Sequence, residues 1–207
     1  MVESELLDTA PGRNPGRTAP PPVVALVCSA GGLDAVQRVL RPLPAAFPAA
    51  LIVLQHQAPE QSSHLREILA RNCRFPVRTA HHGEGLLAGT VYVVPAGQHA
   101  VVTTVNTIVL IPSDGTPPYR PSADLLLTSL ALTAGDRTVG VILSGSGHDG
   151  AVGAAAIHGA GGIVIASDHD TSAWFDMPQA AIQRDDAVDY VVPVDDIPAL
   201  LLALLSS

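Results

Sequence analysis

The sequence predicts an α/β domain: a doubly wound, mostly parallel sheet with helices on both faces and an antiparallel β-hairpin. Short apolar runs rich in Val, Ile and Leu recur along the chain, as strands buried on both faces require. Amphipathic or small-residue segments separate these runs, and this alternation is typical of βαβ units. Hydrophobic residues make up 47% of the chain but aromatic residues only 3%, so aliphatic side chains must supply the core.

The first predicted unit is a strand, a tight turn and a helix. The run from Val23 to Cys28 is apolar and rich in valine, and it stops at Ser29. Small residues with two glycines follow, and residues 33–40 then have amphipathic spacing. The pattern predicts a buried strand with Ser29 at its carboxyl end, followed by a helix.

Further strands and helices alternate along the rest of the chain. A second buried strand at 50–55 ends on His56, and a helix is predicted from Ser62 or Ser63 to Asn72. Segments 100–104 and 107–111 predict a hairpin that adds antiparallel strands to the parallel sheet. The other predicted strands lie at 76–80, 90–94, 138–143, 162–166 and 189–192, the other helices at 122–134, 151–159, from Pro178, and 197–205, and a polar turn at 81–85.

Composition bounds the class of protein. Residues 1–21 are rich in Pro, Gly and Arg and predict a flexible tail, with one globular domain over residues 22–207. The net charge of −8 disfavours binding to nucleic acid, which needs Lys and Arg to displace counterions. The chain shows no signal peptide and no apolar run of membrane-spanning length, so we predict no membrane insertion and a cytoplasmic location.

Three predicted strand ends carry the residues of nucleophilic catalysis: Ser29, His56 and Asp149. The carboxyl ends of parallel strands meet at one edge of the sheet, where ligands bind in open α/β folds. A serine hydroxyl needs an imidazole to take its proton and a carboxylate to fix the imidazole tautomer. The residues therefore form a candidate triad, although Val27 replaces the first glycine of a GxSxG elbow and the order Ser, His, Asp differs from that of α/β-hydrolases.

Two turns offer backbone donors for a developing oxyanion. Ala30 and Gly31 follow Ser29 at a predicted helix N-terminus, where N–H groups stabilise negative charge. The stretch Gly145-Ser146-Gly147 offers a second set of donors. Losing one such donor typically costs about 3–4 kcal/mol of transition-state stabilisation, so these turns matter as much as the triad.

Simpler interpretations compete with catalysis. Ser29 could only cap the first helix, and Gly31 with Gly32 could bind phosphate, although no GxGxxG or GxxxxGK[ST] motif is present. Cys28 is a rival nucleophile, but strand alternation points it into the core. Asp168 and Asp170 follow the next strand and compete with Asp149.

The remaining singled-out residues carry weaker signals. The histidines at 81, 82, 99, 148 and 169 fit no common metal spacing, so solvated loop histidines are favoured and no metal is predicted. Cys28 and Cys73 form no metal or disulfide pattern and are predicted to be reduced. Trp174 and Phe175 are predicted to pack near the site, with core packing as the default interpretation.

A series of motifs recurs in a fixed order along the chain. The motifs are Cys28-Ser29-Ala30-Gly31-Gly32, Leu54-Gln55-His56, Gly83-Glu84 with Gly89 to Gly97 and His99, Pro121-Ser122-Ala123-Asp124, Leu143 to Gly153, and Met177-Pro178 with Ala180-Ala181-Ile182. This series resembles the catalytic domain of the CheB family, the chemoreceptor glutamate methylesterases. The resemblance covers residues 22 to 193, and six motifs in order are far more specific than one.

The resemblance implies an activity. The family's serine, histidine and aspartate match Ser29, His56 and Asp149, with Ala30, Gly31, Ser146 and Met177 framing the oxyanion site and pocket, and His99 at the rim. It implies hydrolysis of γ-glutamyl methyl esters on the cytoplasmic helices of methylated chemoreceptors, or on another protein ester substrate, and possible deamidation of receptor glutamines in chemotaxis-type signalling. No metal or organic cofactor is predicted.

The chain also departs from the family pattern. Ala30 stands where the family usually has threonine, Ser146 replaces a methionine, and Asp176 replaces the glycine before Met177. Only about 21 residues precede the first strand, too few for a receiver domain, so the resemblance is to a stand-alone member. The alternatives are an esterase or amidase of the same fold with a different substrate, and a catalytically inactive interaction domain.

Overall fold

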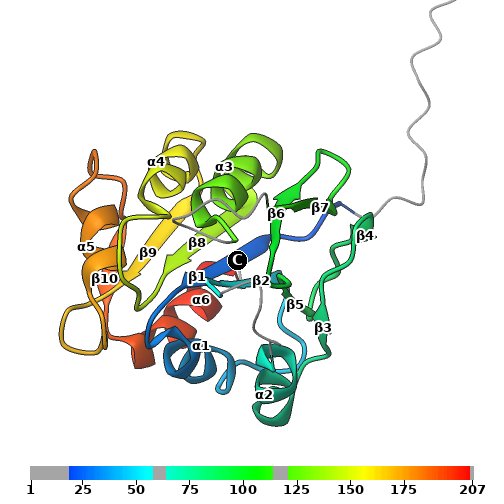
Figure 1. Ribbon diagram of the computed structural model, residues 1–207, viewed down its shortest axis with the longest axis horizontal. Helices are drawn as coiled ribbons and strands as arrows, with labels where there is room; N and C mark the ends of the chain where they lie inside the picture. The colour runs from blue at the N-terminus through cyan, green and yellow to red at the C-terminus, as the bar shows by residue number, and fades with distance from the viewer. Residues whose placement is uncertain (1–18, 58–63, 114–120, 206–207) are drawn as a thin grey trace, which may run out of the picture.

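A computed structural model describes residues 19–57, 64–113 and 121–205. Within these ranges, seven strands form a parallel sheet (Figure 1). Their order across the sheet is β10 (Tyr190–Val192), β9 (Ile163–Ser167), β8 (Thr138–Ile142), β1 (Val23–Cys28), β2 (Ala50–Gln55), β5 (Val91–Val93) and β3 (Val77–Thr79). The parallel, doubly wound arrangement that the sequence predicts is confirmed.

Strand β1 is the centre of this sheet. All six of its residues are buried, because helices cover both faces of the strand. It pairs with β2 on one side and β8 on the other, and the strand order reverses between β1 and β8. A crevice opens at such a reversal, outside the carboxyl ends of the strands. The residues that follow β1 and β8 therefore face the same space.

Three helices cover each face of the sheet (Figure 1). One face carries α1 (Gly32–Leu40), α2 (Leu65–Asn72) and α6 (Ile197–Leu205), and the other carries α3 (Ala123–Thr133), α4 (Ala151–Gly159) and α5 (Asp176–Ile182). Single 3₁₀ turns lie at Gly135–Arg137 and Val194–Asp196. None of the helices in the described ranges is long and apolar enough to cross a membrane.

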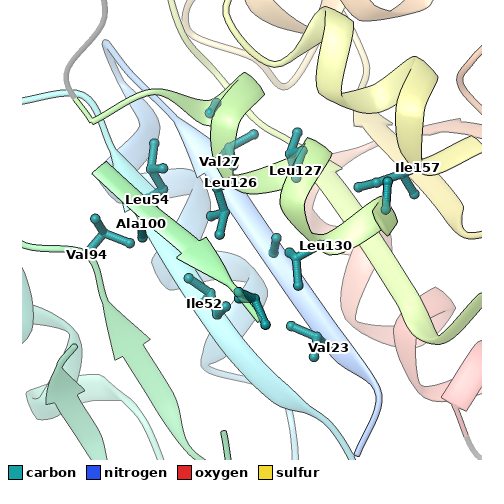
Figure 2. Close-up of a cluster of buried hydrophobic side chains, with 14 of the residues drawn as sticks. Val23, Val27, Ile52, Leu54, Val94, Ala100, Leu126, Leu127, Leu130 and Ile157 are labelled. Carbon is teal, nitrogen blue, oxygen red and sulfur yellow. The ribbon is translucent and has the colours of Figure 1, made fainter. Parts of the chain in front are cut away.

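Figure 2 shows how α3 closes the core on its face of the sheet. Leu126, Leu127 and Leu130 of this helix lie among Val23 of β1 and Ile52 of β2, and all five side chains are fully buried. These leucines recur at helical spacing, so they form one apolar stripe facing the strands. Helix α3 is thereby fixed over β1, with its N-terminus near the edge of the sheet that Ser29 occupies.

The predicted hairpin forms, but in a different place. Strands β6 (Gln98–Val102) and β7 (Thr107–Pro112) pair antiparallel, and β4 (Glu84–Gly85), where a polar turn was expected, pairs with β7. These strands make a separate three-stranded sheet instead of extending the parallel one. Ala100, Val102 and Ile108 join the same core as α3, so the hairpin covers a face of the large sheet.

Most predicted element boundaries agree with the structure to within one or two residues. Helix α2 begins at Leu65, and the expected start at Ser62 or Ser63 lies outside the described residues. Most of the predicted tail also lies outside them, so the division at residue 22 stays a prediction.

Alanine substitutions at two leucines of α3 test whether this helix is stabilised by its packing against the sheet. We expect Leu126→Ala to lower the free energy of unfolding by about 2–5 kcal/mol, because it leaves a cavity in a fully buried position. Leu132→Ala, at a side chain that is 81% exposed, should change it by about 0.5 kcal/mol or less. Urea denaturation followed by circular dichroism measures both values. Equal effects would contradict the packing described for α3.

Candidate active site

Ser29 lies directly after β1, in the turn that leads into α1. Its backbone N–H donates to the Ser144 carbonyl at 3.0 Å, and its carbonyl accepts from the Gly32 N–H at 3.0 Å. Gly31 has a φ of 71°, a left-handed conformation that favours glycine. The turn keeps the half-buried Ser29 at the carboxyl end of β1, where the crevice of the sheet opens.

The sheet register brings His56 beside Ser29. Cys28 and Gln55 are Cα partners in the parallel pair of β1 and β2, and Ser29 and His56 each follow by one residue. The His56 N–H donates to the Cys28 carbonyl at 3.0 Å, which continues the ladder one step past the strands. Ser29 and His56 therefore follow neighbouring strands at the same level, at the carboxyl edge of the sheet.

Asp149 completes the group from the loop between β8 and α4. Its Oδ2 lies 2.8 Å from Nε2 of His56, and the two side chains are 2% and 11% exposed. Asp168 and Asp170, the competing carboxylates, do not join this group: Asp168 accepts hydrogen bonds from Thr171, and Asp170 lies exposed beside His169. Of the three candidates, the structure pairs Asp149 with the imidazole.

Hydrogen bonds keep the buried Asp149 ionised. Burial by itself raises the pKa of this carboxyl. The His56 ring and the backbone N–H groups of Asp124 and Ala123 outweigh burial, so the pKa of Asp149 falls below its ordinary value. The two N–H groups lie at 2.9 and 2.6 Å, and the Ser122 hydroxyl donates at 3.2 Å.

The ionised carboxylate decides the tautomer of His56. A carboxylate without a proton only accepts hydrogen bonds, so Nε2 of His56 must be the donor in this pair. In the neutral ring the other nitrogen, Nδ1, then carries the lone pair that can take a proton. The arrangement is that of an imidazole base oriented by a carboxylate, on the strand next to the one that Ser29 follows.

Cys28, the rival nucleophile, lies on the other side of the strand. Its side chain is fully buried, and burial raises the pKa of the thiol to about 12. The thiolate is the reactive form of cysteine, and it is scarce at neutral pH for such a group. The sequence-based interpretation of Cys28 as a core residue is confirmed.

The turn after Ser29 presents backbone donors. Among the described residues, the N–H groups of Ala30 and Gly31 donate to no protein group, and the same holds for the N–H of Ser146. Ala30 is half-buried, whereas Gly31 and Ser146 are exposed. Ala30 and Gly31 precede the first turn of α1, where the helix dipole favours negative charge.

Ser144 and Met177 connect the loops around the site. Ser144 Oγ donates to the Ala30 carbonyl at 2.8 Å and accepts from the Trp174 N–H at 3.0 Å. The Met177 N–H donates to the Gly145 carbonyl at 3.0 Å, and Met177 is fully buried. A Cβ on Gly145 would overlap the Met177 side chain and lie 2.9 Å from Cβ of Ser29. Met177 therefore packs beneath the turn, as a wall of the site.

Sequence reasoning singled out several residues near this site without finding their contacts. Trp174 was expected to pack near the site, with core packing as the default; it lies beside the turn after Ser29, but its side chain is 54% exposed and does not belong to the core. Ser122 was singled out as part of the Pro-Ser-Ala-Asp motif; in the structure its Oγ accepts from the Leu125 N–H and donates to Asp149. His99 was expected at the rim, and its Nδ1 accepts from the Ser122 N–H at 3.0 Å. The Pro-Ser-Ala-Asp stretch was the available signal for Ser122, but its contact with residue 149 is not local.

No metal cluster is evident in the described part of the chain. Within those residues, no three His, Cys, Asp or Glu side chains gather closely enough to hold an ion. The prediction that the reaction needs no cofactor stays a prediction.

The fold and the group at its edge define a class. A doubly wound sheet that carries a serine, a histidine and a carboxylate at the carboxyl ends of β1, β2 and β8 has the layout of an α/β serine hydrolase. Residues 24–201 match the family model described as CheB methylesterase. The chain belongs to the CheB methylesterase family.

Individual relatives agree with this assignment. A protein-glutamate methylesterase/protein-glutamine glutaminase of Anaeromyxobacter dehalogenans is 44% identical over 92% of this chain and 55% of its own length. The protein-glutamate methylesterase FrzG of Myxococcus xanthus is 36% identical over 95% of this chain and 60% of its own. The crystal structure of the Thermotoga maritima CheB methylesterase catalytic domain superposes with a TM-score of 0.84 at 33% identity, covering 90% of this chain and all of that one.

The chain thus spans between half and three-fifths of the length of these curated relatives. What it shares with them is the part that corresponds to the solved catalytic domain.

The lowered pKa of Asp149 predicts an acid-dependent stability. Its ionised form contributes stability above the unfolded-state pKa, about 4, and this contribution is lost as pH falls through the lowered folded-state pKa. We expect the difference in free energy of unfolding between the unaltered protein and Asp149→Asn to be largest near about pH 6 and to shrink below about pH 4.

Urea denaturation over a series of pH values measures this difference. Asp170→Asn, at a side chain that is 91% exposed, serves as the control and should unfold like the unaltered protein at each pH. A difference for Asp149→Asn that stays constant with pH would contradict the assignment.

Proposed function

We propose that this chain is a protein-glutamate methylesterase: it hydrolyses γ-glutamyl methyl esters with Ser29 as nucleophile, His56 as base and Asp149 as the group that orients His56. The observation that carries the proposal is the hydrogen bond between His56 and the ionised Asp149, one strand away from Ser29. Membership of the CheB methylesterase family supports the choice of ester.

In the first half of the reaction, Ser29 Oγ attacks the ester carbonyl and its proton passes to Nδ1 of His56. The carbonyl oxygen becomes an oxyanion. The tetrahedral intermediate then collapses, the bond to the methoxy group breaks, and His56 returns the proton so that methanol leaves. Asp149 stabilises the imidazolium that forms between these steps.

In the second half, water replaces the serine. His56 takes a proton from water, the hydroxide attacks the glutamyl ester of Ser29, and the collapse returns the proton to Ser29 and releases a glutamate side chain. With a glutamine side chain as the substrate, the first leaving group is ammonia in place of methanol, and the product is the same. The relatives named as both methylesterase and glutaminase support this extension.

The backbone N–H groups of Ala30 and Gly31, together with that of Ser146, are the proposed donors to the oxyanion. Each is without a protein acceptor among the described residues, and donors of this kind gain most where charge develops. Met177, which is fully buried against Gly145, is the proposed floor of the pocket. The proposed donors act through their backbone N–H groups, so their role does not depend on their side chains. Met177 acts through the bulk of its side chain.

The proposed substrate is a methylated glutamate on the cytoplasmic helices of a chemoreceptor, which places the reaction in the cytoplasm. The names of the relatives support a glutamate of a protein as the substrate, and the net charge of −8 disfavours nucleic acid as a partner. The choice of a chemoreceptor rests on the resemblance of the sequence motifs to the chemoreceptor methylesterases.

A second candidate is an esterase or amidase of the same fold with a different substrate. Ala30, Ser146 and Asp176, where the chain departs from the family, are half-buried or exposed. The hydrogen bond between His56 and Asp149 does not involve them. In this second proposal, the residues at these three positions select a different substrate, while the His56–Asp149 pair still supports the same reaction. Turnover of small esters without turnover of receptor esters would favour this candidate.

Replacement of the nucleophile tests the proposal. We expect Ser29→Ala to lower the release of methanol from methylated receptor about 10⁴-fold or more, because no other hydroxyl can form the acyl-enzyme. A fluorophosphonate reagent should label the unaltered protein on Ser29, and peptide mass spectrometry locates the label.

Cys28→Ala is the matched control for the rival nucleophile. Its buried thiol does not take part, so labelling of Ser29 and release of methanol should continue. Undiminished methanol release by Ser29→Ala would falsify the mechanism. Absence of both labelling and ester turnover in the unaltered protein would favour a catalytically inactive interaction domain.

A further inference from the structure

The N-termini of α3 and α4 form a carboxylate exchange, in which a carboxylate from each segment accepts hydrogen bonds from backbone N–H groups of the other. Oδ1 of Asp124, in the first turn of α3, accepts hydrogen bonds from the N–H groups of Gly150 and Gly153 at 2.9 and 2.8 Å. Asp149, just before α4, accepts in return from the N–H groups of Ala123 and Asp124. Helix α4 has no acidic residue in its own first turn, so Asp124 supplies the negative charge that its N-terminus favours.

Two glycines serve this contact: Gly153 lets the helices come close, and Gly150 provides the backbone conformation before α4. A Cβ on Gly153 would lie 2.5 Å from Cβ of Leu127 and 3.2 Å from Cα of Asp124. Gly150 has a φ of 104°, which a residue with a side chain rarely adopts. Both positions serve the contact between Asp124 and the start of α4.

We propose that Asp124 is a positioning residue for the reaction at Ser29. It holds the N–H of Gly150, the residue bonded to Asp149, and thereby fixes the backbone from which the Asp149 carboxylate reaches His56. The proposal rests on the proposed function of Asp149. A carboxylate displaced by about 1 Å orients the imidazole poorly, and such misplacement can cost up to about 10²-fold in rate.

Asp124 accepts both hydrogen bonds through Oδ1. Three variants therefore separate the presence of this oxygen, its position and the charge of the side chain. Asp124→Asn keeps an oxygen in place and should retain most of kcat. Asp124→Ala removes the acceptor and should lower kcat about 10–100-fold with KM unchanged. Asp124→Glu keeps the charge but displaces the oxygen by one methylene, and should lower kcat several-fold even if the alanine variant fails to fold.

Asp189→Ala is the matched structural control. Its Oδ2 accepts from the Val164 N–H at 2.7 Å, at the opposite edge of the sheet from Ser29. Its loss should lower the free energy of unfolding as the loss of a backbone acceptor does, yet leave kcat unchanged. A role of Asp124 in stability alone would make the two alanine variants alike in kcat.

The proton between His56 and Asp149 gives a readout that needs no turnover. Nuclear magnetic resonance detects it as a downfield resonance of the Nε2–H. We expect this resonance in the unaltered protein and in Asp124→Asn, and its shift or loss in Asp124→Ala and Asp124→Glu. An unchanged resonance and kcat in Asp124→Glu, or equal losses in the asparagine and glutamate variants, would overturn the proposal. Absence of ester turnover in the unaltered protein would instead count against the proposed function.

A different observation concerns the mouth of the site. Trp174, the only tryptophan of the chain, is 54% exposed. Its backbone is fixed on both sides, since its N–H donates to Ser144 Oγ at 3.0 Å and its carbonyl accepts from the Gly145 N–H at 2.9 Å. A Cβ on Gly31 would lie 3.3 Å from Cδ1 of the indole. The ring therefore lies over the turn that follows Ser29.

From this placement we infer that Trp174 contacts the protein that carries the ester and sets its affinity. The inference rests on the proposed function. An exposed indole on a fixed backbone loses little freedom when it packs against a partner, and such residues often dominate binding energy. A small ester reaches Ser29 without this contact.

Binding in the Ser29→Ala background tests the inference without turnover. We expect Trp174→Ala to weaken binding of a methylated receptor fragment roughly tenfold or more, and Leu132→Ala, on an exposed leucine remote from Ser29, to leave it unchanged. Circular dichroism should show that Trp174→Ala keeps the fold of the unaltered protein, so that weaker binding reports the loss of the indole. Equal binding with and without the indole would overturn the inference, whereas no binding in the Ser29→Ala background would count against the receptor as substrate.

Discussion

Helices α3 and α4 each receive a carboxylate from the segment that begins the other. The site depends on this exchange, because one of its two carboxylates is the partner of His56. Burying a lone carboxylate costs several kcal/mol, whereas each hydrogen bond to a charged group contributes about 1.5–3 kcal/mol. Asp149 receives several such bonds, so the ionised form prevails despite burial, as its lowered pKa shows.

Asp124 responds in the opposite direction. Burial raises its pKa first, and the nearby charge of Asp149 raises it further, although the N–H groups of Gly153 and Gly150 act against this. The two carboxylates of the exchange therefore differ in their readiness to hold a proton. The carboxyl beside His56 is the one whose pKa is lowered, and its ionised form keeps Nε2 of the imidazole as the donor.

Much of the fold and part of the site are local properties of the sequence. Strands β1 and β2 are continuous apolar runs, and Ser29 and His56 are the first polar residues with catalytic potential after them, so their common edge is predictable. The hairpin at residues 98–112 is also visible, but its place is not, because covering a sheet face or extending a sheet edge needs the same local pattern. Trp174 shows the same limit, since its N–H donates to Ser144 Oγ and its carbonyl accepts from the Gly145 N–H, and both contacts join segments that are distant in the sequence.

The sequence by itself determined the succession of strands and helices along the chain and the residues at the strand ends. Through its motifs it also determined the family. These are set by composition, periodicity and short spacings, which act over a few residues. Only the tertiary structure decided that Asp149, and not Asp168 or Asp170, meets His56, and that Asp124 holds the start of α4. Those choices join residues about a hundred positions apart or on different helices. They follow from sheet register and from how closely Gly153 lets α3 and α4 approach.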